Sequence, residues 1–214
     1  MNTKALILSL MISGFSIFTD AQDQNTNNAP DDPFDVQPLL IGSPVPDLSV
    51  QDVDGREHSL VALISGQPTL LIFYRGGWCP FCNAHLAELA SIENEVYDLE
   101  YQILAISPDQ PGFLSESFEE YEMGYTLLSD SSMEVARAFG VAYCENDETV
   151  ARLKNNGMDI VARSGHDHHQ LPVPAVFITN TSGKILFQYV NPDYRDRISG
   201  KILMAALRAF HVDP

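Results

Sequence analysis

Two cysteines are the residues of this sequence best suited to chemistry. Cys79 and Cys82 are separated by two residues, the first of which is Pro80. A proline suits the first position of a helix, where its missing N–H costs nothing. Cys79 then becomes the N-cap and Cys82 the third helical residue, the spacing at which a capping box brings two side chains together. The sequence therefore predicts that the two sulfurs can form a disulfide with little backbone movement.

The start of a helix also favours a thiolate at this place. Unpaired N–H groups and the positive end of the helix dipole lower the pKa of a thiol from about 8.5 to between roughly 3.5 and 7.5. Arg75 lies four residues before Cys79, and its guanidinium adds a second positive field if its side chain folds back over the turn. Cys79, Cys82 and Arg75 are therefore the predicted catalytic residues.

A cysteine pair of this spacing can be half of a zinc site, a structural disulfide of an exported protein, or a redox pair. The elements on either side favour the redox pair. Residues 69–74 form an apolar, partly β-branched run that predicts a buried central strand. Residues 80–98 predict an amphipathic helix, because apolar residues recur there at helical spacing. A pair between a buried strand and such a helix is typical of thiol–disulfide chemistry.

The same alternation of strands and helices continues along the chain. Asp54-Gly55 and Asn180-Thr181-Ser182-Gly183 supply turn residues, the second of them between two strands that should form an antiparallel hairpin. Strands are expected at 48–51, 69–74, 102–107, 125–128, 175–179 and 185–190, and helices at 80–98, near 113–121, at 131–139 and from about 198 to 210. This order predicts a three-layer α/β domain with a central mixed β-sheet.

The N-terminal residues are expected to lie outside that domain. Residues 1–21 resemble a cleavable export signal, because Lys4 precedes an apolar run that ends before the small residues Thr19 and Ala21. The run is shorter than the roughly 20 apolar residues of a membrane span. Residues 22–40 are rich in Asn, Gln, Asp and Pro and predict a disordered tether. We expect residues 41–214 to form the domain of an exported protein, periplasmic or secreted, with no stable membrane insertion after cleavage.

The charge of the chain disfavours two classes of partner. The formal net charge is −17, whereas nucleic acids and anionic membrane surfaces require clustered Lys and Arg. We expect no nucleic-acid partner.

Two further features could take part in chemistry. Cys144 follows an apolar stretch, and a structural role as a small hydrophobe is favoured over a resolving or intermolecular role. His166-Asp167-His168-His169 could bind a metal, but it lacks the regular spacing of a helical or finger site. Its polar surroundings favour a solvated loop. We therefore expect neither a metal nor a cofactor.

The segment Phe73-Tyr74-Arg75-Gly76-Gly77-Trp78-Cys79-Pro80-Phe81-Cys82 resembles the alkyl hydroperoxide reductase and thiol-specific antioxidant family, the peroxiredoxins. The similarity extends from about residue 41 to residue 210. Residues 42–60, 127–130, 139–141 and 171–178 resemble further family segments, and Val190-Asn191-Pro192-Asp193-Tyr194-Arg195 resembles the peroxiredoxin-like subgroup that carries two cysteines at this spacing. The resemblance implies a thioredoxin-like fold and a hydroperoxide substrate.

The resemblance also places the family's catalytic residues on this sequence. The positions of its Pro, its Thr and its peroxide-attacking Cys are occupied by Arg75, Cys79 and Cys82. The position of its Arg is occupied by Pro174, which resembles the cis-proline that faces the cysteine pair of thioredoxins. Trp78 and Pro174 are therefore expected to shape the substrate site. The family uses its Thr and Arg to orient the peroxide, so these differences alter the part of the site that handles the O–O bond.

Three functions follow from these residues. The first is a thiol-dependent hydroperoxide reductase, a peroxidase in which Cys82 attacks the peroxide, Cys79 closes the disulfide and Arg75 assists the thiolate. A dithiol protein such as a thioredoxin-like donor would restore both thiols. The second is a thiol–disulfide oxidoreductase acting on exported proteins, in which Cys79, more exposed at the helix cap, attacks and Pro174 shapes the peptide-binding edge. The third is a non-catalytic metal-binding domain that uses both cysteines and residues 166–169.

Overall fold

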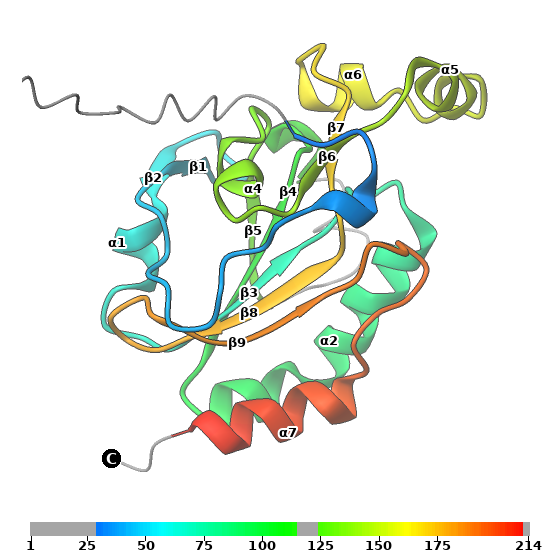
Figure 1. Ribbon diagram of the computed structural model, residues 1–214. Coiled ribbons are helices and arrows are strands. Elements are labelled where there is room, and N and C mark those ends of the chain that lie inside the picture. The colour runs from blue at the N-terminus through cyan, green and yellow to red at the C-terminus, as the bar shows by residue number, and fades with distance from the viewer. Residues whose placement is uncertain (1–28, 115–123, 212–214) are drawn as a thin grey trace, which may run out of the picture.

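The computed structural model describes residues 29–114 and 124–211, and Figure 1 shows their arrangement. The expected export signal lies outside the described residues, as does the helix expected near 113–121 from residue 115 onward. The strands are β1 (Ser49–Gln51), β2 (Glu57–Ser59), β3 (Thr69–Phe73), β4 (Gln102–Ser107), β5 (Thr126–Ser129), β6 (Ala142–Cys144), β7 (Gln170–Pro172), β8 (Ala175–Thr179) and β9 (Ile185–Val190). The helices are α1 (Leu60–Ile64), α2 (Pro80–Asp98), α4 (Glu134–Ala138), α5 (Asp147–Asn155), α6 (Ile160–Ser164) and α7 (Gly200–Phe210), with a 3₁₀ helix, η1, at Pro33–Asp35.

A mixed sheet of seven strands forms the centre of the molecule, in the order β2-β1-β5-β4-β3-β8-β9. β3, β4 and β5 are parallel to one another, whereas β8 pairs antiparallel with both β3 and β9. A separate two-stranded sheet pairs β6 with β7. Because β3, β4 and β5 are parallel, the segments that follow their carboxyl ends meet at one edge of the sheet. The cysteine pair lies at that edge, directly after β3.

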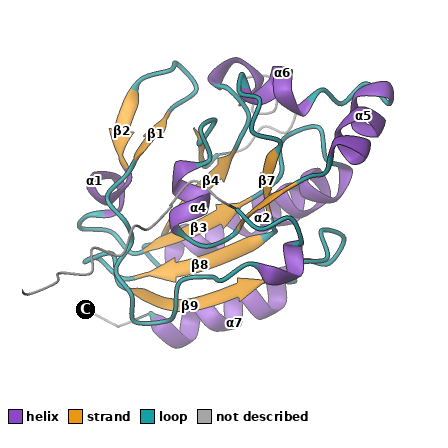
Figure 2. Cartoon of the chain, turned by 45° about the horizontal axis from the view of Figure 1, so that its top comes forward, coloured by secondary structure: helices purple, strands orange, loops and turns teal. Residues whose placement is uncertain are grey.

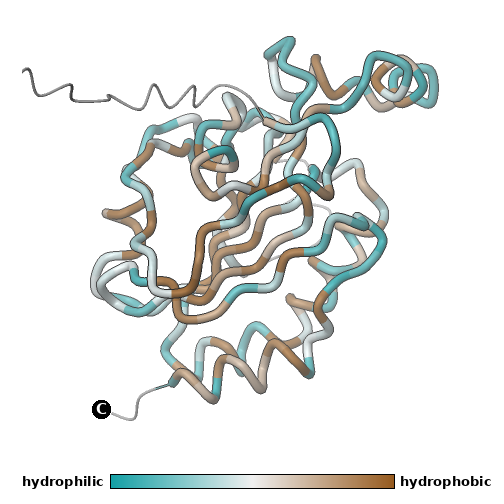
Figure 3. Tube along the Cα trace, viewed as in Figure 1, coloured by the Kyte–Doolittle hydropathy of each residue, from teal (hydrophilic) through white to brown (hydrophobic). Residues whose placement is uncertain are grey.

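Both faces of the sheet are buried. All five residues of β3 are buried, and successive side chains belong to two different apolar clusters, with Leu70 and Ile72 in one and Leu71 and Phe73 in the other. α2 and α7 cover the first face, which Figure 2 shows as two purple helices behind the strands. α1 and α4 pack on the other face. In Figure 3 the central strands are brown along most of their length, as expected for strands buried on both sides. These contacts confirm the expected three-layer α/β domain.

Residues 29–40 differ from the predicted disordered tether. Ala29, Val36 and Leu39 pack against the core cluster that contains α1 and α4. The N–H of Leu39 donates to the carbonyl of Phe139 at 3.0 Å, and the N–H of Cys144 donates to the carbonyl of Pro30 at 2.8 Å. The three apolar residues that anchor this segment are few among its polar residues, so its composition did not indicate them. The two backbone hydrogen bonds join it to residues more than 90 positions away in the chain. In the structure, ordered packing on the domain therefore begins at least twelve residues before the expected boundary at residue 41.

The sequence analysis gave no bounds for β2, β6, β7, α1, α5, α6 or η1. The residues of α5 are all at least partly exposed, so the helix shows no continuous apolar stripe. α1 and α6 have five residues each, and β6 and β7 have three each, which is too short for a period to be read. Among the described residues, no helix has both the length and the apolar character needed to cross a membrane.

Candidate active site

Cys79 and Cys82 lie where the sequence predicts them. Cys79 is the N-cap of α2, with φ −89° and ψ 114°, and Pro80 is the first helical residue. Both thiols are free, and each cysteine is only 1% exposed. The greater exposure expected for Cys79 is therefore wrong, because Cys79 packs with Cys82 in the apolar cluster under α2.

The environment of the pair separates the two thiols. The pKa of Cys79 is lowered to about 6, first by a hydrogen bond from the Cys82 thiol, then by the backbone N–H of Cys82 and by the charges of Arg75 and Arg197. The pKa of Cys82 is raised above its ordinary value, because its proton is held by Cys79 and because burial penalises its thiolate. The N-cap position and the nearby arginine charges therefore favour the thiolate on Cys79, with the proton of the pair on Cys82.

A tight turn between β3 and α2 holds Cys79 in place. Gly76 has φ +132°, and a Cβ there would lie 2.8 Å from an Asp109 carboxylate oxygen and against the Trp78 ring. The N–H of Gly77 donates to Asp109 Oδ2 at 2.9 Å, and the carbonyl of Gly77 accepts from Asn83 Nδ2 at 2.8 Å. Gly77 thus connects the turn to Asp109, after β4, through its N–H and to Asn83, in the first turn of α2, through its carbonyl.

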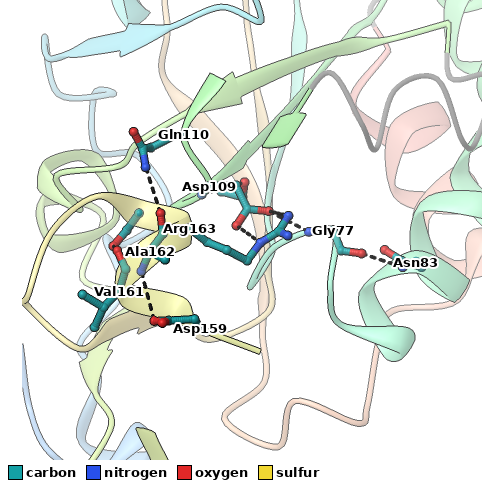
Figure 4. A network of polar contacts seen from close by, with 10 residues as sticks. Gly77, Asn83, Asp109, Gln110, Asp159, Val161, Ala162 and Arg163 are labelled. Atoms are coloured by element: carbon teal, nitrogen blue, oxygen red, sulfur yellow. Dashed lines mark hydrogen bonds and ion pairs between the residues drawn. The ribbon is translucent and has the colours of Figure 1, made fainter. Parts of the chain in front are cut away.

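Arg163 completes this support. Its Nε donates to Asp109 Oδ1 at 2.8 Å and its Nη2 to Asp109 Oδ2 at 3.0 Å, which is a bidentate ion pair. The Asp109 side chain is 1% exposed and that of Arg163 is 18% exposed. Figure 4 shows Arg163 reaching from α6 to Asp109, which in turn reaches Gly77. Gln110 adds a bond from its Nε2 to the carbonyl of Ala162 at 2.9 Å. Asp109 and Arg163 were not singled out in the sequence, because neither belongs to a local motif.

Arg75 folds back over the site as expected. Its buried guanidinium lies 5.1 Å from the Trp78 ring centroid and 4.4 Å from the Tyr194 ring centroid. Its Nη2 donates to Glu145 Oε1 at 3.1 Å, and Glu145 Oε1 also accepts from the Tyr143 hydroxyl at 2.8 Å. The charge of Arg75 lowers the pKa of Cys79. Trp78 therefore lies beside both Arg75 and the turn that carries Cys79, where it was expected to shape the site.

Arg197 contacts the cysteine pair directly, and the sequence analysis missed it. Its Nη2 lies 3.4 Å from Cys82 Sγ. It comes from the segment between β9 and α7, 115 residues after Cys82 in the chain. The only available signal was the resemblance of residues 190–195 to a peroxiredoxin-like subgroup, which ends two residues before Arg197. His85, one turn after Cys82 on α2, is also close to this cation, since burial and then the charge of Arg197 lower its pKa to about 4.

Pro174 differs from the expectation. It precedes β8, and because Ala175 pairs with Phe73, Pro174 lies at the level of Tyr74, at the end of β3. The peptide bond before it is trans, so the expected cis-proline is wrong. Val173 N–H donates to the Val141 carbonyl at 2.8 Å, and the Pro174 carbonyl accepts from Asn191 N–H at 3.0 Å. These bonds hold the chain extended from β7 into β8, which the ordinary trans form satisfies.

Cys144 and the histidine segment are organised apart from the cysteine pair. Cys144 ends β6, and burial raises the pKa of its thiol. His168 Nδ1 accepts from the N–H of Gln170 at 2.9 Å, so its Nε2 donates to the Ser131 carbonyl at 2.9 Å, which occupies both ring nitrogens. His169 pairs with Asp147 and Asp167. Over residues 29–114 and 124–211, no three His, Cys, Asp or Glu side chains gather in a way that could hold a metal ion.

The fold and the site together define a dithiol oxidoreductase, because a CxxC pair with one activated sulfur begins a helix after a central strand. Residues 41–188 match the model of the AhpC/TSA family, and the chain belongs to that family. It is 33% identical over 106 residues to the peroxiredoxin Bcp of Escherichia coli strain K12, which covers 50% of this chain and 67% of that protein. It is 29% identical over 147 residues to the thiol-disulfide oxidoreductase ResA of Geobacillus thermodenitrificans, covering 66% and 74% respectively.

Solved structures show the same fold. The peroxidoxin BcpB of Mycobacterium tuberculosis superposes with a TM-score of 0.62 at 22% identity, over 81% of this chain and 99% of that one. Peroxiredoxin Q of Xanthomonas campestris superposes with a TM-score of 0.62 at 17% identity, over 81% and 98%. The expected thioredoxin-like fold and the resemblance to peroxiredoxins are therefore confirmed.

Proposed function

We propose that the protein is a thiol-dependent hydroperoxide reductase that cycles a disulfide between Cys79 and Cys82. Family membership supports the activity, and the observation that carries the proposal is the buried pair at the start of α2, where Cys79 is the N-cap and its pKa is lowered by Cys82 and by arginine charges. A thiolate is the species that attacks peroxide oxygen. This assigns the first attack to Cys79, in contrast to the assignment to Cys82 that alignment with the family suggests.

In the first step the Cys79 thiolate attacks one oxygen of the hydroperoxide and the O–O bond breaks. Cys79 becomes a sulfenic acid, and the leaving alkoxide takes a proton from water to become an alcohol. Arg75 stabilises the attacking thiolate by its charge, and its place over the Trp78 ring leaves it beside the reacting sulfur. In the second step Cys82 attacks Cys79 Sγ, so that the S–S bond forms and hydroxide leaves, which together with the Cys82 proton makes water.

The burial of both sulfurs favours a small oxidant over a protein disulfide. At 1% exposure, neither Cys79 nor Cys82 offers the surface that a disulfide on a folded protein needs for in-line attack. A hydroperoxide has only two reacting oxygens and needs a much narrower approach. The second candidate, a thiol–disulfide oxidoreductase for exported proteins, is favoured by the similarity to ResA. It requires the segments around Cys79 to open before each turnover.

Two further parts of the proposal concern the setting of the enzyme. A dithiol protein of the thioredoxin type would reduce the Cys79–Cys82 disulfide, since each turnover consumes two electrons. The apolar run in residues 1–21 supports export to a periplasmic or extracellular space, where that donor must also be present.

Stopped-flow fluorescence with hydrogen peroxide tests the proposed function. Trp78 is the only tryptophan of the chain and lies next to Cys79, so its emission should report both oxidation steps. We expect wild-type protein to be oxidised and Cys79→Ser to lose the reaction. Cys82→Ser should keep the first step and accumulate a sulfenic acid that dimedone traps on Cys79. Cys144→Ser is the matched control and should react like wild type.

The opposite pattern would overturn the assignment. A Cys79→Ser variant that consumes peroxide at the wild-type rate would return the attack to Cys82. Wild-type protein that reduces insulin disulfides quickly and hydrogen peroxide slowly would replace the peroxidase by the disulfide oxidoreductase.

A further inference from the structure

The cation nearest to the second cysteine does not belong to the motif around the first. Arg197 Nη2 lies 3.4 Å from Cys82 Sγ, within hydrogen-bonding range of sulfur. Arg197 belongs to the segment between β9 and α7. The guanidinium of Arg75, by comparison, donates a hydrogen bond to Glu145. Of these two arginines, Arg197 is therefore the one whose guanidinium hydrogen-bonds Cys82.

The segment that carries Arg197 is built to hold the guanidinium there. Its Nη1 donates to the carbonyl of Asp196 at 3.0 Å and also to the carbonyl of Tyr194. The neighbouring Arg195 is instead paired with Asp193, through bonds of 2.8 and 2.7 Å. The Tyr194 ring packs edge-on against the ring of Phe81, with 5.7 Å between the ring centroids. Phe81 stands between the two cysteines in the sequence. These contacts tie the segment to the first turn of α2.

No described carboxylate compensates the charge of Arg197 through an ion pair. Within the described part of the chain no carboxylate oxygen lies within 4.0 Å of its guanidinium, so no ion pair neutralises it. Its partners are carbonyl oxygens and a sulfur. The nearby His85 is held neutral by burial and by this charge, and its Nε2 is buried with no hydrogen-bond partner. Arg197 therefore acts on Cys82 by direct contact.

We infer that Arg197 is a catalytic residue of the second step, which stabilises the Cys82 thiolate as it closes the disulfide. The inference rests on the proposed function for its physiological setting. Cys82 is protonated in the reduced pair, because its thiol donates a hydrogen bond to the Cys79 thiolate. Cys82 becomes a nucleophile only after Cys79 has reacted and this hydrogen bond is lost. At that moment the Cys82 proton is lost to water, the Arg197 cation balances the new negative charge, and Cys82 Sγ attacks Cys79 Sγ. Arg75 thus serves the first sulfur and Arg197 the second.

The test separates the two steps in an Arg197→Met variant. With hydrogen peroxide, we expect the first phase of the Trp78 signal to stay within about threefold of wild type, because Arg197 contacts Cys82 and its charge lowers the pKa of Cys79 less than that of Arg75 does. The disulfide-closing phase should slow by at least about tenfold, which corresponds to one unit in the pKa of Cys82. Dimedone-trapped sulfenic acid on Cys79 should increase accordingly.

A second oxidant makes the test independent of peroxide. Glutathione disulfide reacts with the Cys79 thiolate to give a mixed disulfide and one glutathione, and Cys82 then displaces the second glutathione. Intact mass should show the mixed disulfide accumulating in Arg197→Met and not in wild type. Wild-type protein that reacts with glutathione disulfide but ignores peroxide would overturn the proposed function and leave the role of Arg197 standing.

Two variants and a pH series distinguish charge from structure. Arg197→Lys should restore most of the closing rate, and Arg195→Met, which removes a cation from the same segment, should leave it unchanged. Raising the pH to 9.5 should recover the closing rate of Arg197→Met, because hydroxide then removes the Cys82 proton without help. A wild-type closing rate in Arg197→Met with both oxidants, an equal loss in Arg195→Met, or a loss that high pH fails to recover would overturn the inference.

Discussion

Cys79 and Cys82 share one apolar cluster and one degree of burial, yet their thiols differ because each sees different donors. Cys79 accepts one hydrogen bond from the Cys82 thiol and one from the Cys82 backbone N–H at the start of α2. The pKa of Cys82 is raised, because two thiolates in contact repel each other and only one of the pair carries the negative charge. The order of the chemistry is therefore set by hydrogen bonds and not by exposure.

Arg75→Met should raise the pKa of Cys79. The Arg75 cation favours the thiolate, so its loss makes deprotonation harder and shifts the midpoint of alkylation upward from about pH 6. At pH 7 we expect iodoacetamide to react several-fold more slowly, while at pH 9.5 the rate should approach that of wild type. The measurement is the pH profile of the alkylation rate in a Cys144→Ser background.

Glu145→Gln is the control for this variant. It keeps the size of the side chain and removes the carboxylate that pairs with Arg75 at 3.1 Å. The Arg75 charge then acts on Cys79 with less compensation, so the midpoint should stay or fall. If the profile of Arg75→Met coincides with that of wild type, Arg75 has no part in activating Cys79.

At the scale of elements, the site is assembled from segments that follow the parallel strands. β3 leads into the turn and α2, β4 leads to Asp109, and α6 supplies the Arg163 that pairs with Asp109. Asp109 is thus a positioning residue, since it holds Gly77 without touching either sulfur. Its pair is buried, and breaking a buried pair by removing one partner leaves the other charge uncompensated.

Asp109→Asn should destabilise the protein by about 3 kcal/mol, because Arg163 loses a buried bidentate partner. The released turn should also slow the first oxidation step, and this slowing should be larger than a change in the pKa of Cys79 alone would cause. Urea unfolding followed by Trp78 fluorescence gives the first quantity, and stopped-flow oxidation gives the second.

A surface ion pair provides the comparison. Lys154 and Asp159 lie 2.8 Å apart with side chains 65% and 31% exposed, so Lys154→Met should cost less than about 1 kcal/mol and leave oxidation unchanged. The double variant Asp109→Asn/Arg163→Met should cost less than the sum of its single changes. Additive costs would show that the pair does not act as a unit.

For the whole molecule, the segment of residues 29–40 covers the face of the sheet opposite the cysteines. It crosses Gly140, which has φ +68°, and a Cβ there would overlap the backbone carbonyl of Gln37. The same segment continues past Leu40 to Ser43, where it pairs with the start of β9. The N–H of Gly42 donates to the carbonyl of Ile185 at 2.8 Å, and the N–H of Ile185 donates to the carbonyl of Ser43 at 2.9 Å. The domain therefore includes chain that its composition had marked as a tether.

Gly140→Ala measures what this segment contributes. Gly157→Ala is the matched control, since Gly157 has φ +85° and open space around its Cβ position, so it should lose only the roughly 1 to 2 kcal/mol of left-handed strain. Gly140→Ala should lose about 1 to 3 kcal/mol more, because the Gln37 backbone must move. Denaturant unfolding gives both values, and protease cleavage within residues 29–40 should increase only in Gly140→Ala. Equal losses would mean that the segment does not rest on Gly140.

The sequence by itself determined the central elements and the place of the cysteine pair. The expected bounds of β4, α2, β8 and β9 agree with the structure, because hydrophobic period, a proline at the helix start and a four-residue turn are local signals. The same local rule placed Cys79 at the N-cap and Cys82 three residues later. The short helix α5, by contrast, places only Val150 and Leu153 against the core, too few apolar residues for a period to be recognised.

Only the tertiary structure decided which groups surround the two sulfurs. Asp109, Glu145 and Arg197 reach the site from 32, 70 and 115 residues beyond Gly77, Arg75 and Cys82, their respective partners. No spacing rule links such positions, since their approach depends on strand order and on the packing of α6 and α7. The lowered pKa of Cys79 starts from local contacts with Cys82, and the long-range packing adds the charge of Arg197, because a pKa also responds to charges that are close in space and distant in the chain.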